Sequence, residues 1–335
     1  MSLRILVTGA GGYIGTTLVP RLLADGHQVV ALDTFWFGRE LLPEHAALTC
    51  LEIDTRKVPP TVFEGVDAMI DLAALSNDPC GETFGAATWE INHLARARNA
   101  AHAKAAGVRR YVLASSCSVY GFHDEWLDES SPVQPLTTYA RANVAAEQDI
   151  LPLSDADFAV TALRLGTLYG VSPRMRLDLV VNSMCYNAWR HGEIMIHGGG
   201  TQVRPLLHVA DAAAAFAHVV TAAPPGCAGA TINIGREDQN ATINALAEQI
   251  RASAKHPVST RHSGPQDMRS YRVRFNLMAE LMNWQPQHCW QQAWTEIATF
   301  LQHHASSDVL RYHTLDWYRA QGVVTTTGMA VAPEA

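Results

Sequence analysis

The feature that most constrains this chain is a glycine-rich turn near its start. Gly9, Gly12 and Gly15 are spaced as GxxGxxG, directly after an apolar run at residues 3–8 and at the start of an amphipathic pattern over residues 13–24. Glycines in this context let a strand turn sharply into a helix and let the backbone approach a pyrophosphate at the helix N-terminus. The turn therefore predicts a β-strand and an α-helix that together bind a dinucleotide.

An acidic residue ends the second apolar run, which covers residues 29–33. A carboxylate at the position of Asp33 is suited to hydrogen-bond the adenosine ribose hydroxyls. The next residue is Thr34 rather than a basic residue, so a 2′-phosphate would meet repulsion, and we expect NAD to be preferred over NADP. Arg39 is the nearby residue that weakens this preference.

Short apolar runs alternate with helical patterns through the first half of the chain. The runs that predict strands are residues 5–8, 29–33, 68–72, 111–115 and 160–165. This rhythm predicts an α/β fold with a doubly wound parallel sheet of the Rossmann type. Such a sheet binds ligands at the carboxyl ends of its strands, near the point where the winding reverses.

After residue 164 the pattern loosens into segments punctuated by glycine and proline. We therefore expect a second, smaller substrate-binding lobe, and a disordered tail where the chain becomes rich in Thr, Ala and Gly. The predicted division is a dinucleotide-binding Rossmann domain over 1–168 that also receives chain from about 203–235, a substrate-binding lobe over 169–322 and a tail over 323–335.

Composition excludes several classes of function. The chain has 335 residues, a net charge of −7 and no run of Lys or Arg, which argues against nucleic acid or an anionic membrane as the main partner. It has no signal-like segment and no apolar run long enough to span a bilayer, so we expect a cytoplasmic protein. Its six cysteines form no CxxC pair and its fifteen histidines no HExxH motif, so we expect reduced thiols and no metal site.

Further motifs, taken together with the turn, carry a family resemblance. They are Asp54-Thr55-Arg56, Leu72-Ala73-Ala74, Ser115-Ser116-Cys117-Ser118-Val119-Tyr120-Gly121, Tyr139 and Arg204-Pro205-Leu206-Leu207-His208-Val209. From residue 3 to about residue 286 the chain resembles the extended short-chain dehydrogenases/reductases, specifically the NAD-dependent nucleotide-sugar epimerases and dehydratases typified by UDP-glucose 4-epimerase. The resemblance implies a nucleotide-sugar substrate.

The resemblance also implies which residues contact NAD. Asp54 and Thr55 should flank the adenine, residues 72–75 should line the dinucleotide, and Asn92 should lie on a helix that faces the cofactor. The full set of expected cofactor contacts is Gly9, Gly12, Tyr13, Ile14, Gly15, Asp33, Asp54, Thr55, Leu72, Ala73, Ala74, Asn92, Ser115, Tyr139 and Asn143.

Two hydroxyl groups match the reacting part of this family's site. Ser116 matches the hydroxyl that hydrogen-bonds the reacting sugar oxygen, and Tyr139 matches the general base of a YxxxK motif. The chemistry needs this pair, because a phenolate removes the proton of a sugar hydroxyl while NAD takes the hydride from the same carbon.

Arginines are the expected ligands of the substrate diphosphate, because their forked side chains bind phosphate in a bidentate way. Arg204 matches the arginine that grips this group, and Arg269 or Arg272 looks like its downstream partner; for Arg174 and Arg176, salt-bridge roles are an equally open alternative. The expected substrate contacts are Ser76, Ser116, Thr167, Arg174, Asn182, Arg204, Arg269 and Arg272.

The chain departs from the family pattern at Asn143, where the motif has lysine. That lysine normally binds the nicotinamide ribose and lowers the pKa of the tyrosine; a cation at about 4 Å in an effective dielectric near 20 is worth roughly 4 kcal/mol, or about three pKa units. An asparagine at position 143 is able to form the ribose hydrogen bonds but supplies no charge, and Arg141 does not share a helix face with Tyr139. With no replacement nearby in the sequence, we expect the pKa of Tyr139 to lie above about 8.

Cys117 and Ser118 stand where the 4,6-dehydratases of this family carry Asp and Glu, so the standard 4,6-dehydration is disfavoured. Cys117 is then either an acid/base group or a buried inert thiol. The leading interpretation is an NAD-dependent nucleotide-sugar epimerase that transiently oxidises a sugar ring carbon. The alternatives are a nucleotide-sugar dehydratase or ketoreductase, or a catalytically impaired relative that binds NAD.

The resemblance finally implies a homodimer. Its interface is expected to be a four-helix arrangement contributed by the helices after Gly85 and after Thr138, whose apolar faces lie around residues 95–106 and 140–150.

Overall fold

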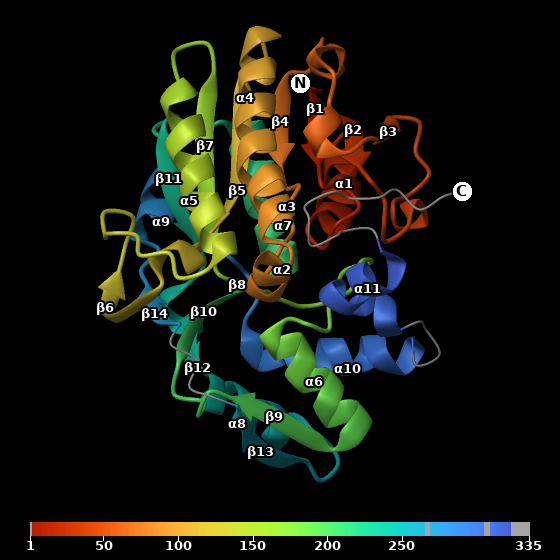
Figure 1. Ribbon diagram of the computed structural model, residues 1–335, viewed down its shortest axis with the longest axis vertical. Helices are drawn as coiled ribbons and strands as arrows, with labels where there is room; N and C mark the ends of the chain where they lie inside the picture. Colours follow the sequence, from red (N-terminus) through yellow and green to blue (C-terminus); the bar gives the residue numbers. More distant parts are fainter. Residues whose placement is uncertain (1, 265–268, 305–308, 323–335) are drawn as a thin grey trace.

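The computed structural model describes residues 2–264, 269–304 and 309–322; the predicted tail over 323–335 lies outside the described residues. Its centre is a parallel seven-stranded sheet in the order β11-β7-β5-β4-β1-β2-β3 (Figure 1). The strands are β1 (Arg4–Thr8), β2 (Gln28–Asp33), β3 (Leu48–Glu52), β4 (Ala68–Asp71), β5 (Arg110–Ser116), β7 (Ala159–Leu165) and β11 (Ala230–Ile234). The predicted α/β fold with a parallel sheet is confirmed.

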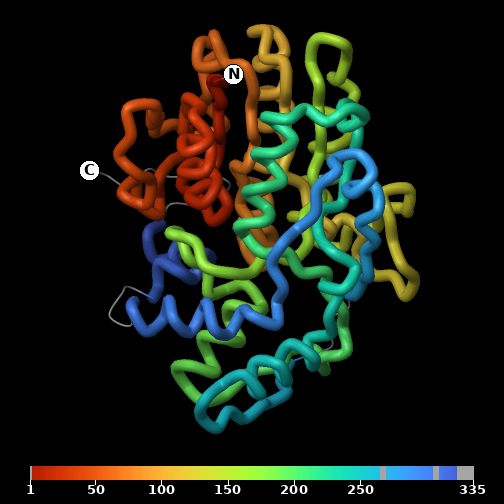
Figure 2. The backbone as a smooth tube through the Cα atoms, turned by 180° about the vertical axis from the view of Figure 1, so that it is seen from behind, coloured from red at the N-terminus to blue at the C-terminus, as the bar shows by residue number. Residues whose placement is uncertain are grey.

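Helices cover both faces of the sheet, which is why its strands are almost continuously apolar. Ile5 and Val7 pack in a core with residues of α1 and α7, whereas Leu6 points to the opposite core, with residues of α4 and α5. Figure 2, the view from behind, shows α7 beside α1 on the face of the sheet that is turned away from the reader in Figure 1. The helices are α1 (Gly15–Ala24), α7 (Val209–Ala222), α4 (Arg96–Ala105) and α5 (Thr138–Ile150).

All five predicted strands are present, and the sheet has two strands that were not predicted. β3 is a half-exposed edge strand with a polar and apolar mixture, so it lacks the continuous apolar run of its neighbours. β11 is buried beside β7 but is short and follows a segment rich in Gly and Pro. Neither carries a strong local strand pattern: β3 is held by pairing with the preceding strand β2, and β11 by pairing with β7, about seventy residues earlier in the chain.

A second group of elements lies below the carboxyl edge of the sheet in Figure 1. It has its own apolar core, to which Ile194, Leu246 and Ile297 contribute. Its elements are α6 (Val180–His191), α8 (Ile243–Ser253), α10 (Ala293–His303), β9 (Glu193–His197) and β13 (Ser259–Ser263). Shorter elements lie between the two cores or beside them: β6 (Phe122–Leu127), β8 (Thr167–Tyr169), β10 (Val203–His208), β12 (Asn240–Thr242), β14 (Ser270–Val273) and α9 (Asn276–Met282).

The winding of the sheet reverses at β1, which pairs with β2 on one side and β4 on the other. The loop after β4 leads into α2 (Asp78–Thr83), α3 (Gly85–Trp89) and a π-helical turn (Glu90–Ala95) that runs directly into α4. From the far end of the chain, α11 (Thr314–Gln321) reaches the same edge, where Tyr318 packs its ring against Phe37 with 5.5 Å between centroids. Three remote parts of the chain therefore meet around the carboxyl ends of β1, β2 and β4.

Two glycines allow α1 to start directly against the sheet. Gly9 has a φ of +67°, and a Cβ there would lie 2.7 Å from the Ala73 backbone nitrogen. A Cβ at Gly15 would lie 2.4 Å from the Gly9 carbonyl oxygen and 2.5 Å from that of Ala10. Since both contacts are to backbone, no side-chain rotation relieves them.

We predict that Gly15→Ala lowers the free energy of unfolding by about 1–3 kcal/mol, because the new methyl group must push the turn away from the helix. Gly85→Ala is the matched control, since a Cβ there meets only the Thr138 methyl carbon at 3.9 Å, and its effect should stay within about 0.5 kcal/mol. Urea unfolding of both variants measures the difference; equal stability would show that the close approach is not required.

Candidate functional site

A cavity of about 670 Å³ lies at the carboxyl ends of the central strands and extends to the second core. The predicted cofactor contacts that line it are Gly9, Gly12, Tyr13, Ile14, Gly15, Asp33, Asp54, Thr55, Leu72, Ala73, Ala74, Ser115 and Tyr139. The predicted substrate contacts that line it are Ser76, Ser116, Thr167, Arg174, Arg204 and Arg269. Residues predicted from separate motifs therefore share one cavity.

Asp33 is held rigidly at the end of β2. Its Oδ2 accepts a hydrogen bond from the Gly11 backbone nitrogen at 3.0 Å, and its Oδ1 accepts one from the Phe35 nitrogen at 2.8 Å. Burial raises the pKa of Asp33, and these backbone hydrogen bonds work against that rise. The carboxylate is thus fixed beside the glycine turn, where a ligand at the turn meets it.

Asp54 and Thr55 follow β3 on the same side of the cavity. Asp54 pairs with Arg56 at 2.5 Å, and the Thr55 hydroxyl accepts a hydrogen bond from Asn99 Nδ2 at 3.0 Å. Burial raises the pKa of Asp54, but the hydrogen bonds from Arg56 outweigh it and leave that pKa below its ordinary value. Both residues are fixed by contacts within the chain before any ligand arrives.

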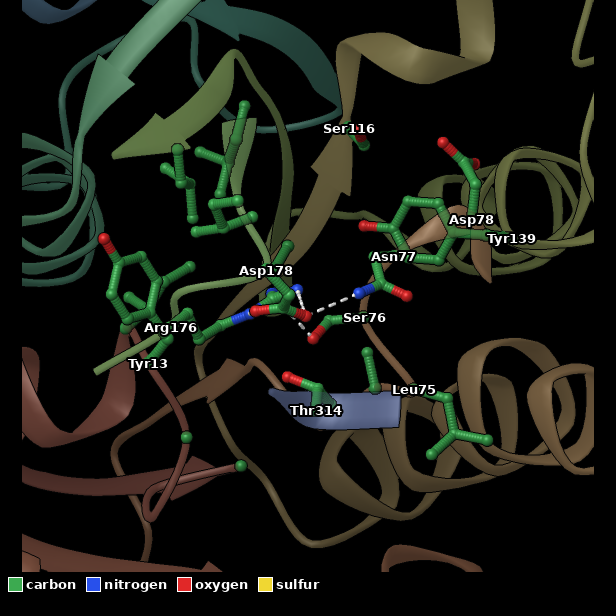
Figure 3. Close-up of a pocket in the computed structure, with 18 of the residues that line it drawn as sticks. Tyr13, Leu75, Ser76, Asn77, Asp78, Ser116, Tyr139, Arg176, Asp178 and Thr314 are labelled. Atoms are coloured by element: carbon green, nitrogen blue, oxygen red, sulfur yellow. Dashed lines mark hydrogen bonds and ion pairs between the residues drawn. The ribbon is translucent and has the colours of Figure 1, made fainter. Parts of the chain in front are cut away.

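Tyr139 and Ser116 reach the cavity from neighbouring elements. Thr137 caps the start of α5, its hydroxyl accepting a hydrogen bond from the Ala140 nitrogen at 3.1 Å, so Tyr139 lies in the first turn of the helix. Ser116 ends β5. Figure 3 shows the two hydroxyl side chains on the same side of the cavity, with Tyr13 across from them.

The pKa of Tyr139 is raised overall, and the fold brings to its side of the cavity a cation that is remote from it in sequence. Arg96, which no sequence motif marks, lines the same cavity and is 1% exposed. Burial raises the pKa of Tyr139, and the charge of Arg96 is the largest influence that opposes this rise. Arg96 is far from Tyr139 in sequence and lies on another helix, so local spacing does not relate the two residues.

Two further buried arginines, Arg174 and Arg176, lie near the first turn of α1. The Arg174 backbone nitrogen donates to Thr16 Oγ1 at 3.3 Å, and the Arg174 guanidinium lies 3.7 Å from the centre of the Phe37 ring. Burial lowers the pKa of Arg174 to about 10, and the neighbouring charge of Arg176 contributes to this decrease. Its guanidinium donates to Thr314 Oγ1 at 2.9 Å.

Arg176 is paired with a carboxylate, as the salt-bridge alternative predicted. Its Nη2 lies 2.9 Å from Asp178 Oδ2, and its Nη1 donates to Ser76 Oγ at 3.1 Å (Figure 3). Burial raises the pKa of Asp178, but Arg176 outweighs it and the pKa falls to about 2. Two buried guanidinium groups and one carboxylate leave an excess of positive charge at this wall of the cavity, which suits an anion.

Arg204 and Arg269 form the far wall. Arg204 on β10 donates from Nη1 to the Val203 carbonyl oxygen at 2.9 Å and also to the carbonyl oxygen of Arg269. Arg269 forms an ion pair with Asp78 of α2. The predicted arginine pair is therefore together, and α2 joins it to the Tyr139 side of the cavity.

Five predicted site residues do not line the cavity, and three asparagines among them support its walls. Asn92 is fully buried and exchanges hydrogen bonds with the backbone of Leu75, at 2.9 and 3.1 Å. Asn182 accepts from the Gly170 nitrogen at 3.0 Å and donates to the Tyr13 hydroxyl at 3.1 Å. Asn143 and Arg272 also lie outside the lining; Asn143 is buried behind Tyr139, and its side chain donates to the Tyr139 carbonyl oxygen at 3.1 Å.

Cys117 also lies outside the cavity and is fully buried. Its thiol donates to the Arg164 carbonyl oxygen at 3.3 Å, and burial raises the pKa of the thiol well above its ordinary value. A protonated thiol with no path to a ligand cannot exchange protons with it, so the geometry supports Cys117 as an inert buried thiol.

Two other kinds of feature are absent from the part of the chain that the structure describes. In residues 2–264, 269–304 and 309–322, no group of three or more His, Cys, Asp or Glu side chains is arranged to hold a metal ion. No helix within the same residues is long and apolar enough to cross a membrane.

Comparison with known proteins agrees with this geometry. Residues 5–235 match the model of the NAD dependent epimerase/dehydratase family. The UDP-glucose 4-epimerase of Mycolicibacterium smegmatis is 31% identical over 85% of this chain and 94% of its own length. UDP-glucuronic acid decarboxylase 1 of Danio rerio is 24% identical over 84% of this chain and 69% of its own length.

The fold comparison leads to the same family. MoeE5, solved in complex with UDP-glucuronic acid and NAD, superposes with a TM-score of 0.80 and 27% identity, over 90% of this chain and 99% of its own. The resemblance predicted from the motifs is thereby confirmed, and these relatives catalyse more than one type of reaction. The chain belongs to the NAD-dependent epimerase/dehydratase family.

Proposed function

We propose that this chain is a nucleotide-sugar epimerase, which oxidises one carbon of a sugar ring transiently and reduces it again from the opposite face. The observation that carries the proposal is that Tyr139 and Ser116 line the same cavity as the glycine turn and Arg204. One cavity therefore contains the glycine turn proposed to bind the dinucleotide, the two hydroxyl groups proposed to transfer the proton, and the arginine proposed to bind the diphosphate.

The residues at the turn fit NAD. Gly9 and Gly15 have no side chain, and backbone atoms lie where a Cβ would be. Because no side chain covers the start of α1, its free N–H groups stay accessible to a pyrophosphate. Asp33 would hold the adenosine ribose, Asp54 and Thr55 the adenine, and Arg174 with Arg176 adds the positive charge that a diphosphate needs. When bound, NAD supplies the hydride acceptor and donor.

Tyr139 would hold and move the proton of the sugar hydroxyl. Its phenolate accepts that proton as the carbon is oxidised and returns it when the carbon is reduced. Ser116 would orient the same oxygen by hydrogen bonding, since its side chain reaches the cavity from the adjacent end of β5. The nucleotide part of the substrate would lie toward the lobe, with its diphosphate against Arg204 and Arg269.

We propose further that residues 169–322 form the substrate-binding lobe, except that the chain over about 203–235 returns to the dinucleotide-binding domain over 1–168. The separate apolar core that includes Ile194 and Ile297 supports a boundary there, and β10 carries Arg204 back toward the sheet.

The proposal predicts a product with the same mass as the substrate. A panel of nucleoside-diphosphate sugars is incubated with the protein and NAD, and products are identified by mass spectrometry and proton NMR. Tyr139→Phe should lower the turnover by about 100-fold or more, because the proton acceptor is lost. Cys117→Ser is the control, since Cys117 does not line the cavity, and it should keep its activity if the protein folds normally.

The alternatives give different results in the same assay. A dehydratase releases a product lighter by one water, and a ketoreductase consumes NADH in proportion to product. A chain that binds NAD but converts no nucleotide sugar is the impaired relative, and full activity of Tyr139→Phe would assign the base to another residue.

The geometry around Asp33 predicts a preference for NAD over NADP. Its carboxylate is fixed by two backbone hydrogen bonds and cannot turn away from a 2′-phosphate, and Arg39 does not line the cavity. Calorimetric titration should therefore give an affinity for NAD at least about tenfold higher than for NADP, a difference of about 1.4 kcal/mol. Asp33→Asn should reduce this difference in affinity between NAD and NADP. Tighter binding of NADP than of NAD to the natural chain would overturn the proposed role of Asp33.

We also propose a homodimer through the exposed face of α3, the π-helical turn and α5. Trp89 and Leu94 are 38% and 48% exposed there and lie in one continuous helical segment, so together they offer an apolar contact to a second chain. Light scattering should give twice the chain mass of 36.5 kDa, and Leu94→Asp should shift it toward the monomer. Phe122→Asp, an exposed aromatic position on β6, should leave the mass unchanged; a monomeric natural chain would contradict the proposal.

A further inference from the structure

A fully buried arginine lies behind the proposed base. Arg96 is 1% exposed and is the first residue of α4, directly after the π-helical turn Glu90–Ala95. A π-helical turn contains more residues than an α-helical turn, so it rotates the residues that follow, and such turns are frequent at functional sites. The turn sets the direction in which Arg96 enters the structure.

The guanidinium of Arg96 ties together three elements that end at the cavity. Its Nε donates to the Ala73 carbonyl oxygen after β4 at 3.0 Å, and its Nη1 donates to the Ala114 carbonyl oxygen of β5 at 3.1 Å. The same Nη1 donates to Asn143 Oδ1 on α5 at 3.2 Å. Arg96 thus contacts Asn143, the residue that stands at the lysine position of the YxxxK motif.

The Nη1 edge of the Arg96 guanidinium faces α5, the helix that carries Tyr139 and Asn143. The nearest carboxylate is Asp71, whose Oδ1 is 3.9 Å from Nε, on the opposite edge of the guanidinium from Nη1. Asp71 also accepts hydrogen bonds from the Thr8 hydroxyl at 2.6 Å and the Tyr111 hydroxyl at 2.5 Å. Asp71 therefore balances the buried charge from the sheet side, while the Nη1 edge faces α5.

We propose that Arg96 takes over the electrostatic role of the missing lysine: it supplies positive charge on the side of Tyr139 and fixes Asn143, which is buried behind that tyrosine. The inference rests on the proposed function in that Tyr139 is taken as the base. Arg96 acts through Asn143 and through space, so it is a positioning residue. The side-chain amide of Asn143 is oriented by this contact, because its oxygen accepts from Arg96 while its nitrogen donates to the Tyr139 carbonyl oxygen.

The other charged groups around Tyr139 do not supply this charge. Helix α2 packs directly on Tyr139 through Gly81 and contributes two acids. Asp78 is paired with Arg269, and Glu82 accepts a hydrogen bond from the Thr138 nitrogen at 2.8 Å at the surface. Asp78 raises the pKa of Tyr139 whereas Arg96 lowers it, since a nearby anion disfavours a phenolate.

The test measures the ionisation of Tyr139 directly, without a sugar substrate. The protein is labelled with carbon-13 at the tyrosine ring carbon that bears the hydroxyl, saturated with NAD, and titrated by NMR across alkaline pH. The Tyr139→Phe spectrum assigns the signal. Arg96→Gln should raise the pKa of Tyr139 by about one unit or more, whereas Arg96→Lys, which keeps the charge, should change it by less than about half a unit.

Two further variants separate the charge from the packing. Arg96→Gln/Asn143→Lys restores a cation at the family position and should bring the pKa back toward its natural value. Arg96→Gln/Asp71→Asn removes the buried pair together, which protects the fold if Arg96→Gln alone leaves Asp71 uncompensated. With Asp71→Asn as its reference, this double variant should still show the raised pKa.

An unchanged pKa of Tyr139 in a folded variant without Arg96 would overturn the inference, as would the absence of rescue by lysine at position 143. The result is independent of the proposed epimerase activity. If no nucleotide sugar is converted but the pKa follows the charge at Arg96, the proposed function fails and the electrostatic role of Arg96 stands. If a nucleotide sugar is converted but the pKa does not change, the proposed function stands and the role of Arg96 fails.

Discussion

The close contact between the start of α1 and the turn after β1 is the constraint on which the site depends. At Gly15 the helix backbone comes so near the Gly9 carbonyl oxygen that any side chain would collide with it. Because no side chain intervenes, the first turn of α1 opens directly onto the edge where β1, β2 and β4 end. Asp33 is fixed to this same turn through Gly11, so the glycine spacing determines where a dinucleotide meets an acid as well as where it meets the helix.

Buried positive charge is the second organising feature. Burying a guanidinium is costly unless its hydrogen bonds are satisfied and its charge is compensated. Arg96 meets this condition with backbone carbonyl oxygens and Asp71, and Arg176 meets it with Asp178. Arg174 has a hydroxyl and an aromatic ring as neighbours instead. The cavity is therefore prepared for anions near α1 and for a phenolate near α5, within a chain that carries a net charge of −7.

Local spacing was enough to predict much of the fold and the outline of the site. The glycine turn, Asp33 and Tyr139 each lie at a place fixed by the strand or helix to which they belong, so their sequence context indicates where they point. Arg96 was not predictable in this way, because its partner Asn143 is on another helix and the π-helical turn before it has no reliable sequence signature. Thr314 likewise reaches the cavity only because α11 returns from the far end of the chain. The resemblance alone did not show which side chains face the cavity: Asn92 and Cys117 both point into the protein and contact backbone groups, one at Leu75 and the other at Arg164. Exposure of a side chain depends on which remote element packs against its segment, and local spacing does not determine that.

The central claim is that one cavity holds NAD at the glycine turn and a nucleotide sugar against the lobe, with Tyr139 between them. A crystal structure of the protein with NAD and UDP tests it most directly. The account predicts density for the adenosine of NAD at Asp33 and Asp54, for its nicotinamide end beside Tyr139, and for the UDP diphosphate at Arg204. Density for UDP at the glycine turn, or a nicotinamide end remote from Tyr139, would contradict it.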